Sequence, residues 1–310
     1  MEINKRIVWA AVRCSMEADG LKQIRGGGKK RRKWLEFNTF LKGFAFALKV
    51  AQLYHRGLDN ARALKLVEHE VLLKNLPASY DGFSMLHLTD PHFDANPGLD
   101  ERVGGLIKDL DVDLFALTGD YRANTFGNYR QILAPVERVV QSIRPKEGVV
   151  AILGNHDTVL MTDHFEKMGI RVLTNETLTI YRDGAPLHVT GIDDVHYYYT
   201  EMAREALETT PQGVRVALIH SPELYDLAAE YGFDFYVTGH THGGQVALPG
   251  GTPIVTHLSA GKHLGRAGFW RHGGVLGYTS SGAGTSGIPV RFNTRPEITL
   301  FTFRRESSVT

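Results

Sequence analysis

The fold is decided by residues 83–92, which read Phe-Ser-Met-Leu-His-Leu-Thr-Asp-Pro-His. Residues 83–88 are mostly apolar and do not alternate with polar residues as a half-exposed strand would, which predicts a strand covered on both faces. The run ends in a polar cluster that contains Asp90 and His92. A carboxylate and an imidazole two residues apart at a strand end can reach one metal ion. The stretch therefore predicts a buried sheet with a ligand site at its edge.

Five later stretches repeat this pattern of an apolar run followed by a polar cluster. They are 114–117 before Gly119-Asp120, 149–153 before Gly154-Asn155-His156-Asp157, 187–189 before Asp193-Asp194, 214–219 before His220, and 233–237 before Gly239-His240-Thr241-His242. Apolar residues at helical spacing lie between several runs, at 99–110, 129–143, 201–208 and 222–231. Alternating strands and helices predict an α/β layered fold, in which the side chains that follow the strands meet at the carboxyl edge of the sheet. We expect the Gly- and Pro-rich remainder to be β-rich, with loops over this site and short strands at 274–278 and 297–303.

The composition restricts the chemistry of any metal site. The chain has 310 residues, 14 of them histidine, and a single cysteine, Cys14. One cysteine excludes an intrachain disulfide, a multi-cysteine zinc site and an iron–sulfur cluster. Any metal must therefore be held by nitrogen and oxygen ligands. The sequence also lacks a Walker loop, a G-x-S-x-G motif and a dinucleotide-binding fingerprint.

The polar clusters together offer more ligands than one ion can use. Taken singly, Asp-x-His, a polar turn after a strand or a histidine at a strand end is unremarkable. Together, the carboxylate, imidazole and amide groups suit divalent first-row metals, and Asp120, with two carboxylate oxygens, is the natural bridge between two ions. Glycines precede Asp120, Asn155 and His240, and we expect them to permit the abrupt turns that place these side chains.

The ordered set D-x-H, G-D, G-N-H-D, H and G-H-x-H resembles the calcineurin-like metallophosphoesterase superfamily, over residues 83 to about 303. The run 239–245 looks like the bacterial branch of YkuE- and YaeI-like phosphoesterases. The resemblance implies a four-layer αββα sandwich. It also implies one ion held by Asp90, His92, Asp120 and His242, and a second held by Asp120, Asn155, His220 and His240.

The resemblance further implies hydrolysis of a phosphodiester or pyrophosphate bond by a hydroxide that bridges the two ions. His156 would contact the phosphate or the leaving group, and Asp157 would orient His156. Arg122, two residues after Asp120, is a candidate phosphate contact. Two divalent ions are expected as cofactors, manganese first, with iron, zinc or cobalt also compatible with these ligands.

The substrate is less determined than the reaction. Alternatives of the same fold are a UDP-2,3-diacylglucosamine pyrophosphatase-like enzyme of lipid A synthesis, a phosphomonoesterase and a nuclease. The best-known pyrophosphatases of that kind carry Asn-Arg-Asp where this chain has Asn155-His156-Asp157, which weakens that assignment. Residues 57–310 are acidic, which disfavours long nucleic acids as partners. A non-catalytic scaffold would be expected to lack some ligands, and none is missing.

The N-terminal part differs in charge from the rest. Residues 1–56 contain 13 Lys and Arg against four Asp and Glu, a net charge of +9 within a chain of net charge +1. We divide the chain into a basic linker and amphipathic helical extension, 1–66, and a catalytic domain, 67–310. The linker is the run Arg-Gly-Gly-Gly-Lys-Lys-Arg-Arg-Lys at 25–33. The apolar residues of the following helix are Phe37, Leu41, Phe44, Leu48 and Ala51, widened by Phe40, Phe46, Val50 and Leu53.

Three interpretations of this extension remain open. The helix packs on the catalytic domain, or residues 29–54 contact an anionic membrane surface peripherally, or Arg31-Arg32 belongs to a twin-arginine-like export signal. Lys42 and Lys49 interrupt the apolar run, so a membrane-spanning helix is not expected. We expect a cytoplasmic protein, with contact at the inner membrane face and export as alternatives, and a phosphoester substrate that is free or lipid-linked.

Other polar residues receive weaker predictions. We expect Asp193 and Asp194 to be structural and His87 to be buried near the site. For His196 and Tyr197–Tyr199, lining a substrate groove and simple packing are equally open. Six further histidines are expected at the surface: His55, His69, His164, His257, His263 and His272.

Overall fold

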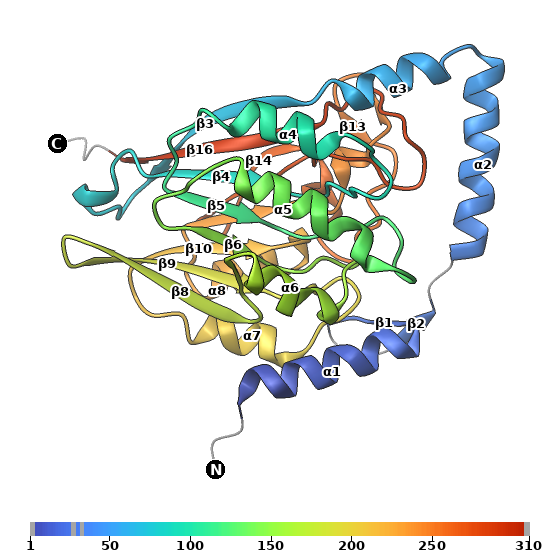
Figure 1. Ribbon diagram of the computed structural model, residues 1–310. Helices are drawn as coiled ribbons and strands as arrows, with labels where there is room; N and C mark the ends of the chain where they lie inside the picture. Colours follow the sequence, from blue (N-terminus) through green and yellow to red (C-terminus); the bar gives the residue numbers. More distant parts are fainter. Residues whose placement is uncertain (1–3, 26–28, 32–33, 307–310) are drawn as a thin grey trace.

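The computed structural model describes residues 4–25, 29–31 and 34–306. Two six-stranded sheets lie at its centre (Figure 1). The first sheet has the order β3 (Lys65–Leu73), β16 (Glu297–Arg305), β4 (Ser84–Leu88), β5 (Leu114–Leu117), β6 (Val149–Ala151) and β7 (Ile170–Val172). Strands β4 to β7 are parallel, and β16 runs antiparallel to β4.

The second sheet is also mixed. Its order is β14 (Gly268–His272), β15 (Val275–Thr279), β11 (Phe235–Thr238), β10 (Val214–Ile219), β9 (Ala185–Ile192) and β8 (Glu176–Arg182). The four inner strands are parallel, and both edge strands pair antiparallel. The inner strands β5 and β10 are buried at every position, as their unbroken apolar runs predict.

The two sheets face each other across one apolar core. Its members come from both sheets, for example Met85, Leu114, Val216 and Phe235. The outer face of the first sheet is covered by α4 (Leu99–Ile107), α5 (Leu133–Gln141) and α6 (Thr162–Lys167), and that of the second by α7 (Glu201–Glu208) and α8 (Tyr225–Glu230). The chain therefore forms the predicted four-layer αββα sandwich. Each layer buries the apolar face of its neighbour, which fixes the strand ends that carry the polar clusters.

Short elements complete the chain between these layers. A small hairpin is formed by β12 (Ala247–Leu248) and β13 (Thr252–Pro253). Single 3₁₀ turns cover Ala78–Tyr80, Tyr129–Ile132, Val159–Met161, Pro222–Leu224, His242–Gly244 and Lys262–Gly265. The C-terminal part is thus loop-rich with short strands, as predicted.

The N-terminal extension contains a helix that the sequence analysis missed. Helix α1 (Lys5–Asp19) crosses one end of the sandwich, below α6 and α7 (Figure 1), and buries Trp9, Arg13 and Met16. Strand β1 (Leu21–Gln23) follows and pairs antiparallel with β2 (Lys29–Arg31). The described part of the basic run, residues 29–31, is thus a strand where a linker was expected. Residues 26–28 and 32–33 of that run lie outside the described residues.

Helix α2 (Trp34–Val50) stands along one edge of the molecule and leads into α3 (Tyr54–Arg62) (Figure 1). Leu48 is buried against Ile288 and Val290, and Leu41 and Phe44 pack beside them. Phe46 and Val50 point the other way, each with 69% of its surface exposed. Among the described residues, none of the helices combines the length and the apolar character needed to cross a membrane.

Candidate metal and phosphoester site

The predicted site residues meet at the carboxyl ends of five strands from both sheets. Asp90 and His92 follow β4, Asp120 follows β5, and Asn155 and His156 follow β6 in the first sheet. His220 follows β10, and His240 and His242 follow β11, in the second. Residues separated by about 150 positions in sequence thus form one cluster, because the two sheets present the same edge to it.

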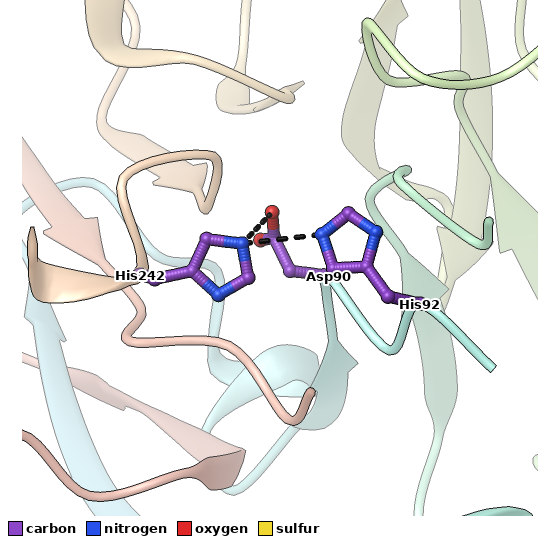
Figure 2. A group of neighbouring side chains, drawn as sticks. All are labelled: Asp90, His92 and His242. Atoms are coloured by element: carbon purple, nitrogen blue, oxygen red, sulfur yellow. Dashed lines mark hydrogen bonds and ion pairs between the residues drawn. The ribbon is translucent and has the colours of Figure 1, made fainter. Parts of the chain in front are cut away.

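Asp90, His92 and His242 point toward one another and form one group within this cluster (Figure 2). The Nε2 atoms of His92 and His242 lie 3.2 Å apart, and Nε2 of His242 lies 3.4 Å from Oδ1 of Asp90. All three side chains are buried. Two imidazole nitrogens this close, beside a carboxylate, form a donor set that a divalent ion can fill.

Asp120 links this group to a second one. Its Oδ2 lies 3.8 Å from Nε2 of His92 and 3.3 Å from Nε2 of His220. Asp120, His220 and His240 have ligand atoms within 4.8 Å of one another. The amide oxygen of Asn155 completes this side, 3.1 Å from Nε2 of His220 and 2.8 Å from Nδ1 of His240. The carboxylate of Asp120 therefore stands between two sets of ligands.

The backbone of the ligand loops is held in an unusual conformation. Five of the predicted ligands have a backbone φ between +43° and +67°, a region that residues other than glycine rarely adopt. They are Asp90, His92, Asp120, His240 and His242. Such strain persists where the surrounding structure enforces it, and it is frequent at functional sites. The glycines beside them act mainly by close approach. A Cβ on Gly154 would lie 2.2 Å from Oδ1 of Asp120, and one on Gly239 would lie 2.2 Å from Oδ2 of Asp90.

Backbone carbonyls orient two of the imidazoles. Nδ1 of His92 lies 2.8 Å from the carbonyl oxygen of Arg122, and Nδ1 of His220 lies 2.8 Å from that of Thr118. Since a carbonyl only accepts hydrogen bonds, Nδ1 must be the donor in each ring. When neutral, each ring then directs the lone pair of Nε2 into the cluster, which is the form that binds a metal.

The electrostatics of the cluster favour mixed protonation. Burial lowers the pKa of His240 and of His242 well below the ordinary value, so both imidazoles are neutral. For His220, burial alone would lower the pKa, but the carboxylate of Asp120 outweighs it and raises the pKa well above the ordinary value. For Asp120, burial alone would raise the pKa, but His220 outweighs it and lowers the pKa well below its usual range. The opposite shifts of Asp120 and His220 indicate that the carboxylate attracts positive charge, which a bound cation would supply in place of the proton.

Two buried polar atoms support occupation by metal. Nε2 of His240 and Oδ1 of Asp90 are buried and make no hydrogen bond to the described residues. An unsatisfied buried polar atom costs about 1–3 kcal/mol, so such atoms require an explanation. Coordination to a cation would satisfy both atoms, and the nitrogen and oxygen donor set fits a divalent first-row metal.

The expected catalytic residues differ in their contacts. His156 lies on the rim of the cluster, with Nε2 3.8 Å from Oδ2 of Asp120 and Nδ1 donating to the carbonyl of Ala123. The carboxylate of Asp157 was expected to orient His156. It instead accepts hydrogen bonds from the backbone amides of Asp120 at 2.7 Å, Gly154 at 2.8 Å and Tyr121 at 3.0 Å. Asp157 therefore fixes the two ligand loops to each other.

Arg122 also braces a loop. Its guanidinium donates to the carbonyl oxygens of His156 at 2.6 Å and Thr125 at 2.8 Å, and the side chain is buried. Arg122 is absent from the lining of the cavity described next. Its expected contact with phosphate therefore stays a prediction without geometric support.

A cavity of about 390 Å³ opens from the cluster. Its polar lining includes Asp120, Asn155, His156, His240 and His242. Its apolar lining comprises Phe40, Leu41 and Phe44 from α2 together with Ile254, Val255 and Ile288. An amphipathic helix from the N-terminal extension therefore forms one wall of the site, a contact that the sequence alone could not locate.

The remaining polar predictions divide between cavity and core. His196 and Tyr197 line the cavity, whereas Tyr198 and Tyr199 are buried. His257 is exposed, as expected, and it also lines the cavity. Asp194 caps a turn by accepting from the amide of Tyr197 at 2.7 Å, as a structural residue would. His87 is buried, with Nε2 2.7 Å from the hydroxyl of Thr118.

Comparison with known proteins agrees with this geometry. The family model for calcineurin-like phosphoesterases matches residues 83–244, more than half of the chain and the whole range that holds the predicted ligands. Two Bacillus subtilis proteins are similar over nearly their full length. The uncharacterized metallophosphoesterase YkoQ is 28% identical over 84% of this chain and 98% of its own, and the uncharacterized metallophosphoesterase YkuE is 27% identical over 88% and 99%. Phosphodiesterase YaeI of Escherichia coli is 25% identical over 70% of this chain and 81% of its own. The chain belongs to the calcineurin-like phosphoesterase family.

Proposed function

We propose that this protein hydrolyses a phosphodiester or pyrophosphate bond with two divalent metal ions. Asp90, His92, Asp120 and His242 would hold one ion, and Asp120, Asn155, His220 and His240 the other. The observation that carries this proposal is the position of Asp120, whose carboxylate lies within 3.8 Å of ligand nitrogens on both sides. Manganese is the first candidate for both ions, and iron, zinc and cobalt suit the same donors.

Two bound ions would supply a water of lowered pKa and would neutralise charge on the phosphate. The role left to the chain is orientation and proton transfer. Because Nδ1 of His156 donates to the carbonyl of Ala123, its Nε2 carries a proton only in the imidazolium form. In that form Nε2 can donate a proton to the leaving oxygen, so His156 is the proposed general acid.

A lipid-linked phosphoester fits the cavity best. The polar lining residues would bind the phosphate, and the apolar lining residues, among them Leu41 and Phe44 of α2 and Ile288, suit a hydrocarbon chain. A purely ionic substrate would leave that apolar wall in contact with water. The apolar wall therefore favours a diester that carries a hydrocarbon chain, or a lipid pyrophosphate such as UDP-diacylglucosamine.

We further propose that α2 rests on an anionic membrane surface. Phe46 and Val50, four residues apart, share the outward face of the helix and are each 69% exposed. Lys42 and Lys49 are exposed on the same helix, within the segment of highest positive charge. An apolar face flanked by lysines suits the boundary between acyl chains and anionic headgroups. The inner face of α2 would then receive a lipid substrate directly from the surface that its outer face contacts.

The position of α1 bears on the N-terminal alternatives. Arg31-Arg32 follows α1, so cleavage after a twin-arginine-like signal would remove Trp9 and Arg13, which are buried against the catalytic part. These contacts favour a protein that keeps its first helix. We accordingly propose that the boundary at residue 67 separates two parts of one folding unit, with α1 packed into the unit that carries the site.

The proposal is tested by hydrolysis of ethyl and dodecyl p-nitrophenyl phosphate, two diesters that share one leaving group. With Mn²⁺ we expect turnover of both, a lower KM for the dodecyl ester, and loss of turnover in EDTA. p-Nitrophenyl phosphate, single-stranded DNA and UDP-diacylglucosamine, assayed in parallel, distinguish a monoesterase, a nuclease and a lipid pyrophosphatase. Hydrolysis of no phosphoester by the metal-loaded protein would contradict the proposed function.

A further inference from the structure

Arg13 reaches from α1 to the back of the loop that carries Asn155 and His156. Only 1% of its surface is exposed. Its Nη2 donates to the carbonyl oxygens of Gly154 and Asp157, each at 3.1 Å, and its Nη1 donates to Oδ1 of Asp193 at 2.7 Å. The two carbonyls flank Asn155 and His156, so one guanidinium holds both ends of this short loop.

Two carboxylates and a ring keep the guanidinium in place. Asp193 accepts at its other oxygen from Nε1 of Trp9 at 2.7 Å. Glu17 accepts from Nε of Arg13 at 2.9 Å, and its carboxylate also accepts from the hydroxyl of Thr158 at 2.6 Å. The guanidinium carbon lies 3.5 Å from the centre of the Tyr198 ring. Burial alone would lower the pKa of Arg13, but Asp193 and its neighbours raise it above the ordinary value, so the group stays charged.

We propose that Arg13 is a positioning residue for the second metal site, acting through the loop of Asn155 and His156. This inference rests on the proposed function for its catalytic consequence, but not for its structural content. A planar guanidinium can serve a carboxylate and two carbonyls at once, because its donors lie in a fixed fork. A lysine has one ammonium and cannot span the same three acceptors.

A displacement of this loop would be transmitted directly to the ligands. Gly154 is so close to Asp120 that a Cβ there would lie 2.2 Å from Oδ1. The backbone amide of His156 donates to that same oxygen at 2.9 Å. The side chain of Asn155 contacts the rings of both His220 and His240. A shift of a few tenths of an ångström in the loop would therefore alter the geometry on both sides of Asp120.

Asp193 acquires a role by the same contacts. The sequence places it after a strand, and we expected it to be structural. It joins Trp9 and Arg13 of α1 to the second sheet, while Arg13 joins α1 to the first. Helix α1 thus connects the two sheets at the edge where their ligands meet.

The test compares Arg13→Met and Arg13→Lys with Arg6→Met, a control on the same helix whose side chain is partly exposed and paired with Glu166. The readouts are the two Mn²⁺ affinities by calorimetry, amide hydrogen exchange over residues 154–158, and kcat with KM. For both Arg13 variants we expect one Mn²⁺ to bind about 10-fold more weakly, as for loss of other groups that support metal ligands. We also expect faster exchange in the loop and a lower kcat at unchanged KM. Arg6→Met should match the wild type in all three.

Asp193→Asn provides a second variant if Arg13→Met does not fold, since it weakens the anchor of Arg13 and leaves the guanidinium in place. Wild-type Mn²⁺ affinities and wild-type loop exchange in the folded Arg13 or Asp193 variants would overturn the inference, even if thermal stability fell. If the wild type binds two ions but hydrolyses no phosphoester, the proposed function fails, while the affinity and exchange measurements still decide the role of Arg13.

Discussion

The cluster of predicted metal ligands and the α2 wall both line one cavity and are built in different ways. The cluster is polar, buried and held by strained backbone at the ends of the sheet strands. The wall is apolar and comes from a helix that buries only Leu48 among its described side chains and exposes Phe46 and Val50. Under the proposed function, the cluster would react with any phosphoester, and the wall would favour those that carry an apolar chain.

The largest effect should come from Asp120→Asn, which acts on the cluster alone. The amide keeps the shape of the side chain but removes the charge that both ligand groups share. We expect hydrolysis of the ethyl and dodecyl diesters to fall equally, by at least about 100-fold, since loss of a ligand should exceed the effect of its supporting groups. Initial rates at saturating Mn²⁺ give the measurement. A variant with nearly normal turnover would refute the bridging role of Asp120.

His156→Gln should come next and should again not distinguish the two diesters. Loss of a general acid lowers kcat by about 100-fold or more, while the predicted ligands are untouched. Mn²⁺ content measured on the same preparation is the control and should equal that of the wild type. If kcat for both diesters stays near the wild-type value, the leaving oxygen receives its proton from a group other than His156.

Phe44→Ala should separate the wall from the cluster. Truncating this ring removes apolar surface worth about 1.5–3 kcal/mol when fully covered, so KM for the dodecyl diester should rise by about 10-fold. The ethyl diester should react as with the wild type. Phe46→Ala, on the outward face of the same helix, is the matched control and should change neither KM. An equal rise in KM for both diesters would mean that α2 supports the structure of the cluster and does not distinguish between the two substrates.

The double substitution Phe46→Ser with Val50→Ser should have the smallest effect on catalysis. It should leave turnover in soluble assays unchanged and weaken only the binding to membranes. These side chains are 69% exposed and do not line the cavity. We expect weaker co-sedimentation with vesicles that contain anionic lipid, by about 10-fold, and unchanged turnover of the ethyl diester. Binding of this variant that equals the wild type would remove α2 from the membrane proposal.

The sequence predicted an α/β layered fold and its strands because unbroken apolar runs are local signals, whereas the four-layer sandwich was implied by the family resemblance. Strands β5 and β10 begin and end at the expected residues, and helix α7 matches its predicted range. The close approach of the cluster residues also followed from strand order, since side chains after parallel strands share one edge. Residue types and spacing sufficed there, because each motif lies on a single loop.

The contacts of the N-terminal helices could not be predicted in the same way. Arg13 is separated from Asp193 by 180 residues, and nothing near Arg13 in the sequence marks it as buried. Helix α2 was visible from its apolar spacing, but which surface it covers depends on Ile288 and Val290 in a loop far along the chain. The contacts of Arg122 and Asp157 were missed for a related reason, because their partners are backbone groups that no residue type reveals.

Titration of metal-free protein with Mn²⁺, followed by both bound metal and hydrolysis of the ethyl diester, tests the central claim most directly. The account predicts two ions bound per chain in the wild type and activity that rises until two equivalents are present. Full activity with one ion per chain, or in the presence of EDTA, would contradict it.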